Sequence, residues 1–123
     1  GEVKGTASSH ATAVENTCVS CHLENHAFEA SLASCQDCHE GIEDFDLNGA
    51  QTEIEELADE LGEYLKAAGL LDEEGHPVKG TYPEDQAQAA WNYIYIVLED
   101  KSMGLHNTAY AKALLEAGLA VFK

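Results

Sequence analysis

Residues 18–39 read CVSCHLENHAFEASLASCQDCH, and all four cysteines of the 123-residue chain lie in this stretch. The cysteines form two pairs, each with two residues between its members. A histidine follows each pair at once, so the motif C-x-x-C-H occurs at 18–22 and again at 35–39. The pattern indicates a kind of site that uses two thiols and one adjacent imidazole, and that occurs twice.

The cysteine spacing, C-x2-C-x13-C-x2-C, is also compatible with two disulfide bonds or with a zinc site of four thiolates. Neither needs the histidines, because a C-x-x-C disulfide closes a very small ring and a tetrahedral zinc ion is already saturated by four sulfurs. C-x-x-C-H is the attachment motif of c-type haem, in which the thiols bond to the porphyrin and the imidazole binds the iron. The sequence therefore predicts two c-type haems, attached through Cys18, Cys21, Cys35 and Cys38, with His22 and His39 as proximal iron ligands.

The first fifty residues contain few large aliphatic side chains, whereas each haem would add a large flat apolar surface. At about 25 cal/mol per Å² of buried apolar surface, two haems would replace much of the missing aliphatic packing. We therefore expect the haems to form part of the hydrophobic core of a single domain, residues 1–123.

The sixth coordination position of each iron decides the chemistry, because an open iron binds small molecules and a closed one mainly transfers electrons. We expect His106 to be one distal ligand, since Gly104 allows a close backbone approach and a helix expected after the histidine would hold the ring. We expect His10 to be the other, because it ends a small, polar loop that precedes the first motif.

Three other side chains are alternative distal ligands. His26 lies too close to His22 to turn onto the same haem, and it is the alternative to His10 on the second. His76 lies in the polar sequence DEEGHPVKG, which favours an exposed loop. Met103 would raise the reduction potential as a thioether ligand, but imidazoles are in excess.

From Thr52 onward, apolar residues recur at steps of three and four while acidic residues take the other side, which predicts an amphipathic helix. We expect Gly69 to end this helix in a left-handed conformation. A second helix is expected to begin with a capping box formed by Thr81 and Glu84.

The second helix continues through QAQAAWNYIYIVLED, where Trp91 and Tyr95 belong to a broad apolar face. Ser102, Met103 and Gly104 interrupt it, and a third helix, capped by Asn107 or Thr108, follows. The fold class is thus mainly α. We expect a small multihaem cytochrome c fold with three C-terminal helices around two haems and little or no sheet.

Charge restricts the partners. The chain has 23 acidic residues against 6 lysines, which gives a formal net charge of -17. Such a field repels nucleic-acid phosphates and anionic lipid, and no apolar run is long enough for membrane insertion. The first ten residues do not have the order of a signal peptide, so we expect that the leader of an exported chain has already been removed.

The segment from His10 through CVSCH (18–22) and CQDCHEG (35–41), and then WNYIYIVLEDKSMGLHNTAYAKALLEAG (91–118), resembles part of a known family. It is similar to the last two haem sites and the C-terminal helices of cytochrome c nitrite reductase and related multihaem cytochromes. The more specific part is GLHN followed by a helix. The chain looks most like a small dihaem cytochrome reduced to that module.

The resemblance also implies a ligand set. It assigns Cys18, Cys21 and His22 to haem 1 with His106 as the distal ligand, and Cys35, Cys38 and His39 to haem 2 with His10 as the distal ligand. In larger relatives the position of His26 ligates a third haem, which has no counterpart here. The lysine-ligated catalytic haem of the nitrite reductases is also missing, so the resemblance does not carry their activity.

These features predict a low-potential electron-transfer protein with two closely packed bis-histidine haems, because imidazole on both faces and nearby carboxylates favour ferric iron. Since both irons would be closed by histidine, we do not expect an enzyme. The alternatives are a small haem enzyme, such as a peroxidase or an oxyanion reductase with one open iron, and an electron-transfer subunit of a larger periplasmic reductase. We expect redox partner proteins, such as other cytochromes or a reductase. Haem attachment outside the bacterial cytoplasm predicts a periplasmic or cell-surface location.

Overall fold

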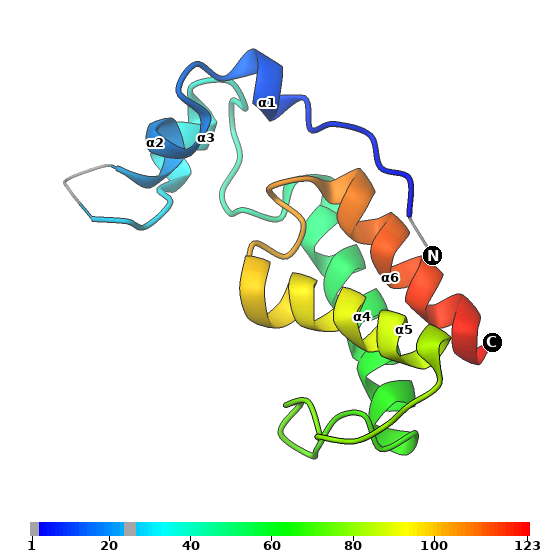
Figure 1. The fold of residues 1–123 in the computed structure, drawn as a ribbon. Helices are drawn as coiled ribbons and strands as arrows, with labels where there is room; N and C mark the ends of the chain where they lie inside the picture. The colour runs from blue at the N-terminus through cyan, green and yellow to red at the C-terminus, as the bar shows by residue number, and fades with distance from the viewer. Residues whose placement is uncertain (1–2, 24–26) are drawn as a thin grey trace.

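The computed structural model describes residues 3–23 and 27–123, and helices dominate it (Figure 1). Within these two ranges, the β pairing is limited to an isolated antiparallel bridge between Leu71 and Pro77. The expectation of a mainly α chain with little or no sheet is therefore confirmed. None of the described helices is both long and apolar enough to cross a membrane.

Short helices come first along the chain, and long ones follow. The short ones are α1 (His10–Ala13), α2 (Thr17–His22), α3 (Leu32–Gln36) and the three-residue 3-10 helix η2 (Leu47–Gly49). The long ones are α4 (Ala50–Ala67), α5 (Glu84–Ile94) with its π-helical continuation η3 (Tyr95–Asp100), and α6 (Thr108–Phe122).

The hydrophobic core belongs to α4, α5, η3 and α6, together with the turn that follows α4. Its buried members are Ile54, Ala58, Leu61, Leu65, Leu70, Leu71, Ala89, Ala90, Ile96, Ala111, Leu114, Leu115 and Leu119. None of the described residues before Ile54 is buried. The first part of the chain is thus short of core, as its composition predicts.

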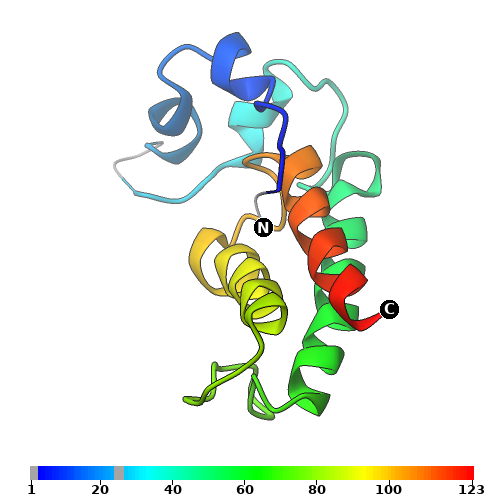
Figure 2. The same cartoon turned by 45° about the vertical axis from the view of Figure 1, so that its right-hand side comes forward.

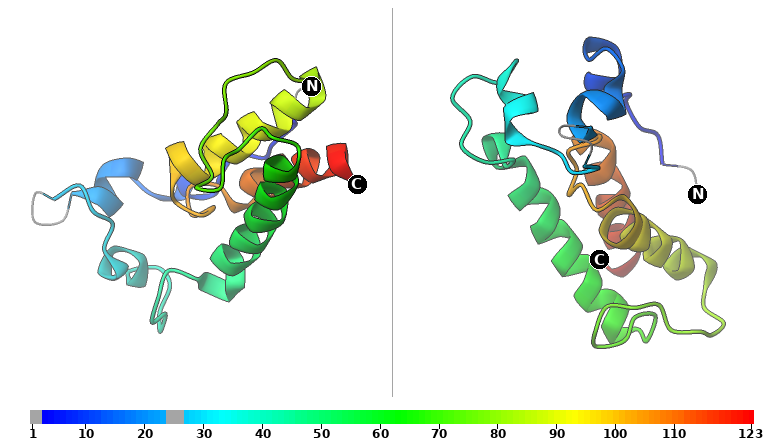
Figure 3. Two further views of the ribbon diagram at one scale, coloured as in Figure 1. Left: turned by 90° about the horizontal axis from the view of Figure 1, so that it is seen from below. Right: turned by 90° about the vertical axis from the view of Figure 1, so that its left-hand side faces the viewer.

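The helix bundle has the cysteine-bearing stretch at one end rather than at its centre. Figures 2 and 3 show α1, α2 and α3 beside the end of the bundle where α4 begins and where the loop from η3 enters α6. We expected the three long helices to surround the haems. Instead they pack on one another, because their own apolar faces are sufficient to form a core.

Two of the long helices match their predicted limits. α4 begins two residues earlier than expected and ends before Gly69, which has the left-handed φ of 76° that closes a helix. α6 begins at Thr108, and the side-chain oxygen of Asn107 accepts a hydrogen bond of 3.1 Å from the backbone N–H of Tyr110. This is the expected N-cap.

Predictions for the second helix were wrong in two respects. The capping box does not form, because Pro83 is extended (ψ 143°) and the helix begins only after it, at Glu84. Trp91 is 67% exposed and Tyr95 is 44% exposed, although both were assigned to the apolar face. The small side chains of Ala89 and Ala90 form the buried contact instead, which lets α5 lie close to its neighbours.

The loop between η3 and α6 is unusually constrained. Three of its residues have positive φ: Lys101 (59°), Met103 (47°) and Gly104 (86°). Gly104 is buried, and a Cβ atom placed on it would lie 2.8 Å from Cγ1 of Ile54. This close contact is with the core of the bundle, and it fixes the start of α6 against α4.

Asp46 caps the N-terminus of α4 from four residues before the helix. Its Oδ1 accepts hydrogen bonds from the backbone N–H groups of Gln51 (2.7 Å) and Thr52 (3.1 Å), and its Oδ2 accepts one from Thr52 Oγ1 (2.6 Å). The side-chain bond from Thr52, followed by the backbone bonds, lowers the pKa of Asp46 below its usual value, against a smaller opposing effect of burial. The carboxylate thus ties the cysteine-bearing half of the chain to the bundle.

The tight contact at Gly104 predicts that Gly104→Ala destabilises the protein more than Gly69→Ala does. Both glycines have positive φ, which costs an alanine about 1–2 kcal/mol. A Cβ at Gly69 meets nothing within 4 Å, whereas at Gly104 it overpacks Ile54 at a further cost of about 1–3 kcal/mol. Urea unfolding followed by circular dichroism measures both variants, and equal losses would contradict the overpacking.

The cap at Asp46 predicts a pH-dependent effect of Asp46→Ala. Because folding lowers the pKa of this carboxyl, its stabilisation is complete above the unfolded-state value of about 3.9 and is lost as the pH falls through the lower folded value. Thermal unfolding should show a lower midpoint for the variant at pH 7, with the difference shrinking in acid. Glu43→Ala removes an exposed carboxylate nearby and is the control; an equal loss there would indicate a general charge effect.

Candidate functional site

The first C-x-x-C-H motif forms a short helix. Cys18 and Cys21 lie one turn apart on α2, which ends at His22. Residues three apart on a helix share a face, so both thiols can reach one flat ligand while the histidine follows directly. The local structure therefore suits attachment of a single group through both cysteines.

The second motif starts on α3 and continues as a turn. Cys35 lies on the helix, and its carbonyl oxygen accepts hydrogen bonds from the backbone N–H groups of Cys38 (3.2 Å) and His39 (2.8 Å). The Ser31 side chain caps α3 by accepting from the backbone N–H of Ser34. Both motifs thus have a helical turn between their cysteines.

All four cysteines are free thiols. Cys18 and Cys38 are exposed, whereas Cys21 and Cys35 are half-buried. Burial, with a smaller contribution from the nearby Cys21, raises the pKa of Cys35. The thiols do not gather into a cluster whose sulfurs all lie within 4.8 Å of one another, as a four-thiolate zinc site requires.

The two motif histidines each lie close to a histidine from outside the cysteine-bearing stretch. The ring centroids of His22 and His106 are 6.1 Å apart, with an interplanar angle of 63°. Those of His39 and His10 are also 6.1 Å apart, with an angle of 89°. These are the two pairs that the resemblance to multihaem cytochromes implies.

The separation of the rings suits a shared metal ion. A metal–imidazole bond is about 2 Å long and the bonding nitrogen lies about 1 Å from the ring centroid, so two rings on opposite faces of one ion have centroids about 6 Å apart. The centroid distance in both pairs thus has the length that two imidazoles on one iron require, and two thiols lie beside the motif histidine in each case.

His22 also has an unsatisfied nitrogen. Its Nδ1 is buried and, within the described part of the chain, is the one buried side-chain nitrogen or oxygen without a hydrogen-bond partner. The ring stacks on Phe28 with a centroid distance of 4.6 Å. His22 as a whole is half-buried, so the missing partner concerns Nδ1 alone. Buried polar groups without a hydrogen-bond partner are rare in folded proteins, and imidazole is the commonest protein ligand of metal ions.

His106 has a carboxylate partner that sequence reasoning missed. Its Nδ1 lies 2.6 Å from Oδ1 of Asp100, the last residue of η3, whose side chain is only 15% exposed. Burial raises the pKa of Asp100, but hydrogen bonds from Ser102 and His106 outweigh it, so the pKa is lowered overall. Asp100 is therefore ionised at neutral pH, and Nε2 is the His106 nitrogen left for a metal.

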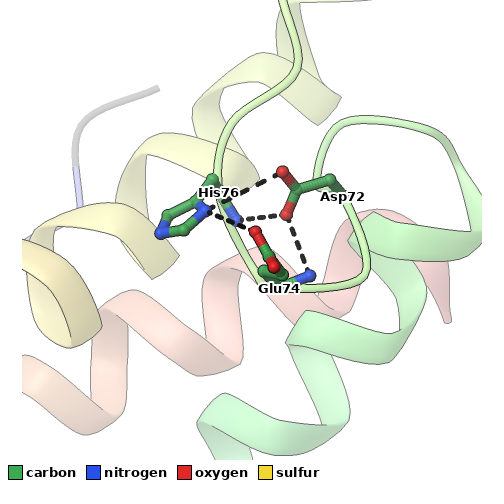
Figure 4. Close-up of side chains that lie close together, drawn as sticks. All are labelled: Asp72, Glu74 and His76. Atoms are coloured by element: carbon green, nitrogen blue, oxygen red, sulfur yellow. Dashed lines mark hydrogen bonds and ion pairs between the residues drawn. The ribbon is translucent and has the colours of Figure 1, made fainter.

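The alternative ligands are less suited to the site. His26 lies outside the described residues. Met103 packs against the hydrophobic core. His76 lies at the far end of the bundle, in the loop after α4, with its Nδ1 3.8 Å from Asp72 and 3.7 Å from Glu74 (Figures 1 and 4).

Asp72, Glu74 and His76 form an exposed cluster, but the loop itself explains it. Oδ1 of Asp72 accepts hydrogen bonds from the backbone N–H groups of Glu74 (3.0 Å) and His76 (2.8 Å), which close the turn. Hydrogen bonding, above all from the His76 N–H, lowers the pKa of Asp72. The cluster thus serves the turn and is separate from the cysteine-bearing end.

No protein-family model, curated protein or solved structure matches this chain. The functional argument therefore depends on the residues and on the geometry of the two histidine pairs.

Proposed function

We propose that the chain is a low-potential electron-transfer protein that carries two c-type haems, each with histidine on both faces of the iron. The observation that supports this most strongly is the arrangement of the imidazoles. Each C-x-x-C-H histidine lies 6.1 Å, centroid to centroid, from a histidine supplied by another segment.

Each residue has a defined part in this proposal. The first haem would be attached to Cys18 and Cys21 and ligated by His22 and His106; the second would be attached to Cys35 and Cys38 and ligated by His39 and His10. When bound, the haems would supply reversible one-electron oxidation and reduction. The distal imidazoles keep small molecules from the irons, and for this reason we propose no enzymatic activity.

The low potential follows from the groups that the chain provides. Two imidazoles favour ferric iron more than imidazole with a thioether does. The net charge of -17 acts in the same direction, because negative charge stabilises the more positive oxidation state. Asp100, in contact with His106, is the carboxylate with the most direct effect.

The cysteine-bearing half of the chain exposes large apolar side chains that a cofactor would cover. Val19, Leu23 and Phe28 are 52%, 49% and 75% exposed there. Flat porphyrin surfaces would cover such side chains and supply the core that this half lacks, at about 25 cal/mol per Å² removed from water. The haem-bearing segment and the bundle would then form one dihaem domain over residues 1–123, with the three long helices beside the haems.

The proposal extends to partners and location. Redox proteins such as other cytochromes or a reductase would exchange electrons with the haems. The alternative is that the chain is an electron-transfer subunit of a larger periplasmic reductase. Covalent attachment of haem takes place outside the bacterial cytoplasm, which supports a periplasmic or cell-surface location. An acidic surface favours partners with basic docking faces.

Covalent attachment is tested by mass spectrometry of the chain exported by a host with the haem attachment machinery. The intact protein should carry the mass of two haems. The double variants Cys18→Ala/Cys21→Ala and Cys35→Ala/Cys38→Ala should each carry one. An unmodified wild-type chain would overturn the proposal.

Distal ligation is tested by electron paramagnetic resonance and by carbon monoxide binding to the reduced protein. Wild type should be fully low-spin and should not bind carbon monoxide. His106→Ala and His10→Ala should each open one of the two irons, whereas His76→Ala, which changes a histidine at the far end of the bundle, should open neither.

The pairing is resolved by combining these changes. His106→Ala should open an iron in the variant that lacks the second haem and should have no effect in the variant that lacks the first. Carbon monoxide binding by wild type would instead favour the alternative function, a small haem enzyme such as a peroxidase or an oxyanion reductase.

A further inference from the structure

We propose that Asp100 is a positioning residue that fixes the tautomer and orientation of His106 and makes this ring a stronger electron donor than His10. The inference rests on the proposed function, because it concerns His106 as a distal iron ligand. It goes further because it assigns to Asp100, a residue outside the two motifs, the role of making the reduction potentials of the two haems differ.

The first step is the tautomer. A carboxylate can only accept a hydrogen bond, so the 2.6 Å contact between Oδ1 of Asp100 and Nδ1 of His106 places the imidazole proton on Nδ1. The lone pair of the neutral ring is then on Nε2, the nitrogen left for ligation. A carboxylate that accepts from a ligating histidine also raises the basicity of the ring.

The second step is the rigidity of the carboxylate. Oδ2 of Asp100 accepts from both the hydroxyl (2.5 Å) and the backbone N–H (3.2 Å) of Ser102, so both carboxylate oxygens are engaged. The same hydroxyl accepts a hydrogen bond of 3.2 Å from the backbone N–H of His106. The carbonyl of Ser102 accepts from the side-chain amide of Gln51, which anchors the group to α4.

The third step is the contrast with the other pair. Across the described ranges, no carboxylate forms a hydrogen bond or ion pair with the His10 ring, whose structural contact is with the ring of His39. His10 belongs to the four-residue helix α1, whereas His106 follows a loop fixed by Gly104 against Ile54. The two proposed distal histidines therefore differ: His106 has a carboxylate partner and a fixed backbone, whereas the His10 ring has no carboxylate partner among the described residues.

The experiment compares Asp100→Asn with Glu99→Gln in the haem-loaded protein. Both variants lose one negative charge at neighbouring positions, but Glu99 is exposed and only Asp100 contacts His106. Potentiometry should show that Asp100→Asn favours reduction of the first haem at least tenfold, which is 59 mV for one electron. The second haem should change much less, and Glu99→Gln should shift neither centre by a comparable amount.

A spectroscopic readout separates positioning from a general field effect. In Asp100→Asn the low-spin resonance of the centre ligated by His106 should move while that of the other centre stays, and Glu99→Gln should leave both in place. Equal shifts in the two variants, or an unchanged potential and resonance in Asp100→Asn, would overturn the inference.

Ser102→Ala provides a second variant in case Asp100→Asn fails to load haem. It keeps the carboxylate and the histidine but removes the hydroxyl that holds Oδ2, so it should shift the first haem in the same direction by a smaller factor. No shift in this variant would count against the positioning role. A wild-type protein without bis-histidine haems would refute the proposed function itself, whereas an unresponsive but intact dihaem protein would refute only the role of Asp100.

Discussion

Two pairs of imidazole rings join segments that are far apart in the sequence. His22 and His39 are fixed beside their cysteines by short helical turns, whereas His10 and His106 come from segments before and after them. In both pairs the ring centroids are 6.1 Å apart, so α1, the two motifs and the residues just before α6 lie close together. The first fifty residues contribute no buried side chain in the part of the chain that the structure describes. Apart from the imidazole pairs, they meet the bundle through Val3, which packs against the core, through the hydrogen bond from Asn107 to the Thr6 carbonyl, and through the Asp46 cap.

The helix bundle supplies what the cysteine-bearing segment lacks. Ile54, Leu61, Leu65 and Leu115 are fully buried, so the bundle has a conventional aliphatic core and can present one end as a stable platform. The motif region has little core of this kind and exposes large apolar side chains. Such a division makes sense if the cofactors that we propose complete the packing of one half while helices complete the other.

Much of this organisation was predictable from local sequence. Periodic apolar positions in α4 and the Asn107 cap of α6 are local features, and both predictions are confirmed. The face of α5 was not predictable in the same way, because its buried side is formed by small alanines and its later turns widen into the π-helix η3. Trp91 looked like core from its chemistry alone, but its exposure depends on how closely the helices pack.

The candidate site, like the fold, was predictable from local sequence only in part. The motifs identify the cysteines and two histidines, while the contribution of Asp100 depends on a loop that reverses direction through residues of positive φ. No spacing rule connects an aspartate at the end of one helix with a histidine six residues later. The conformation of the loop between them brings their side chains to hydrogen-bonding distance.

The contact of Gly104 with Ile54 couples the helix bundle mechanically to His106. Gly104 packs directly against Ile54 of α4, so a shift of α4 relative to α6 would move the Gly104 backbone, two residues before His106. Mechanical strain in the aliphatic interior would thus be transmitted to the imidazole. Docking of another molecule on the outer surface of α4 would in this way change the electron affinity of the haem iron that we propose His106 binds, without touching it.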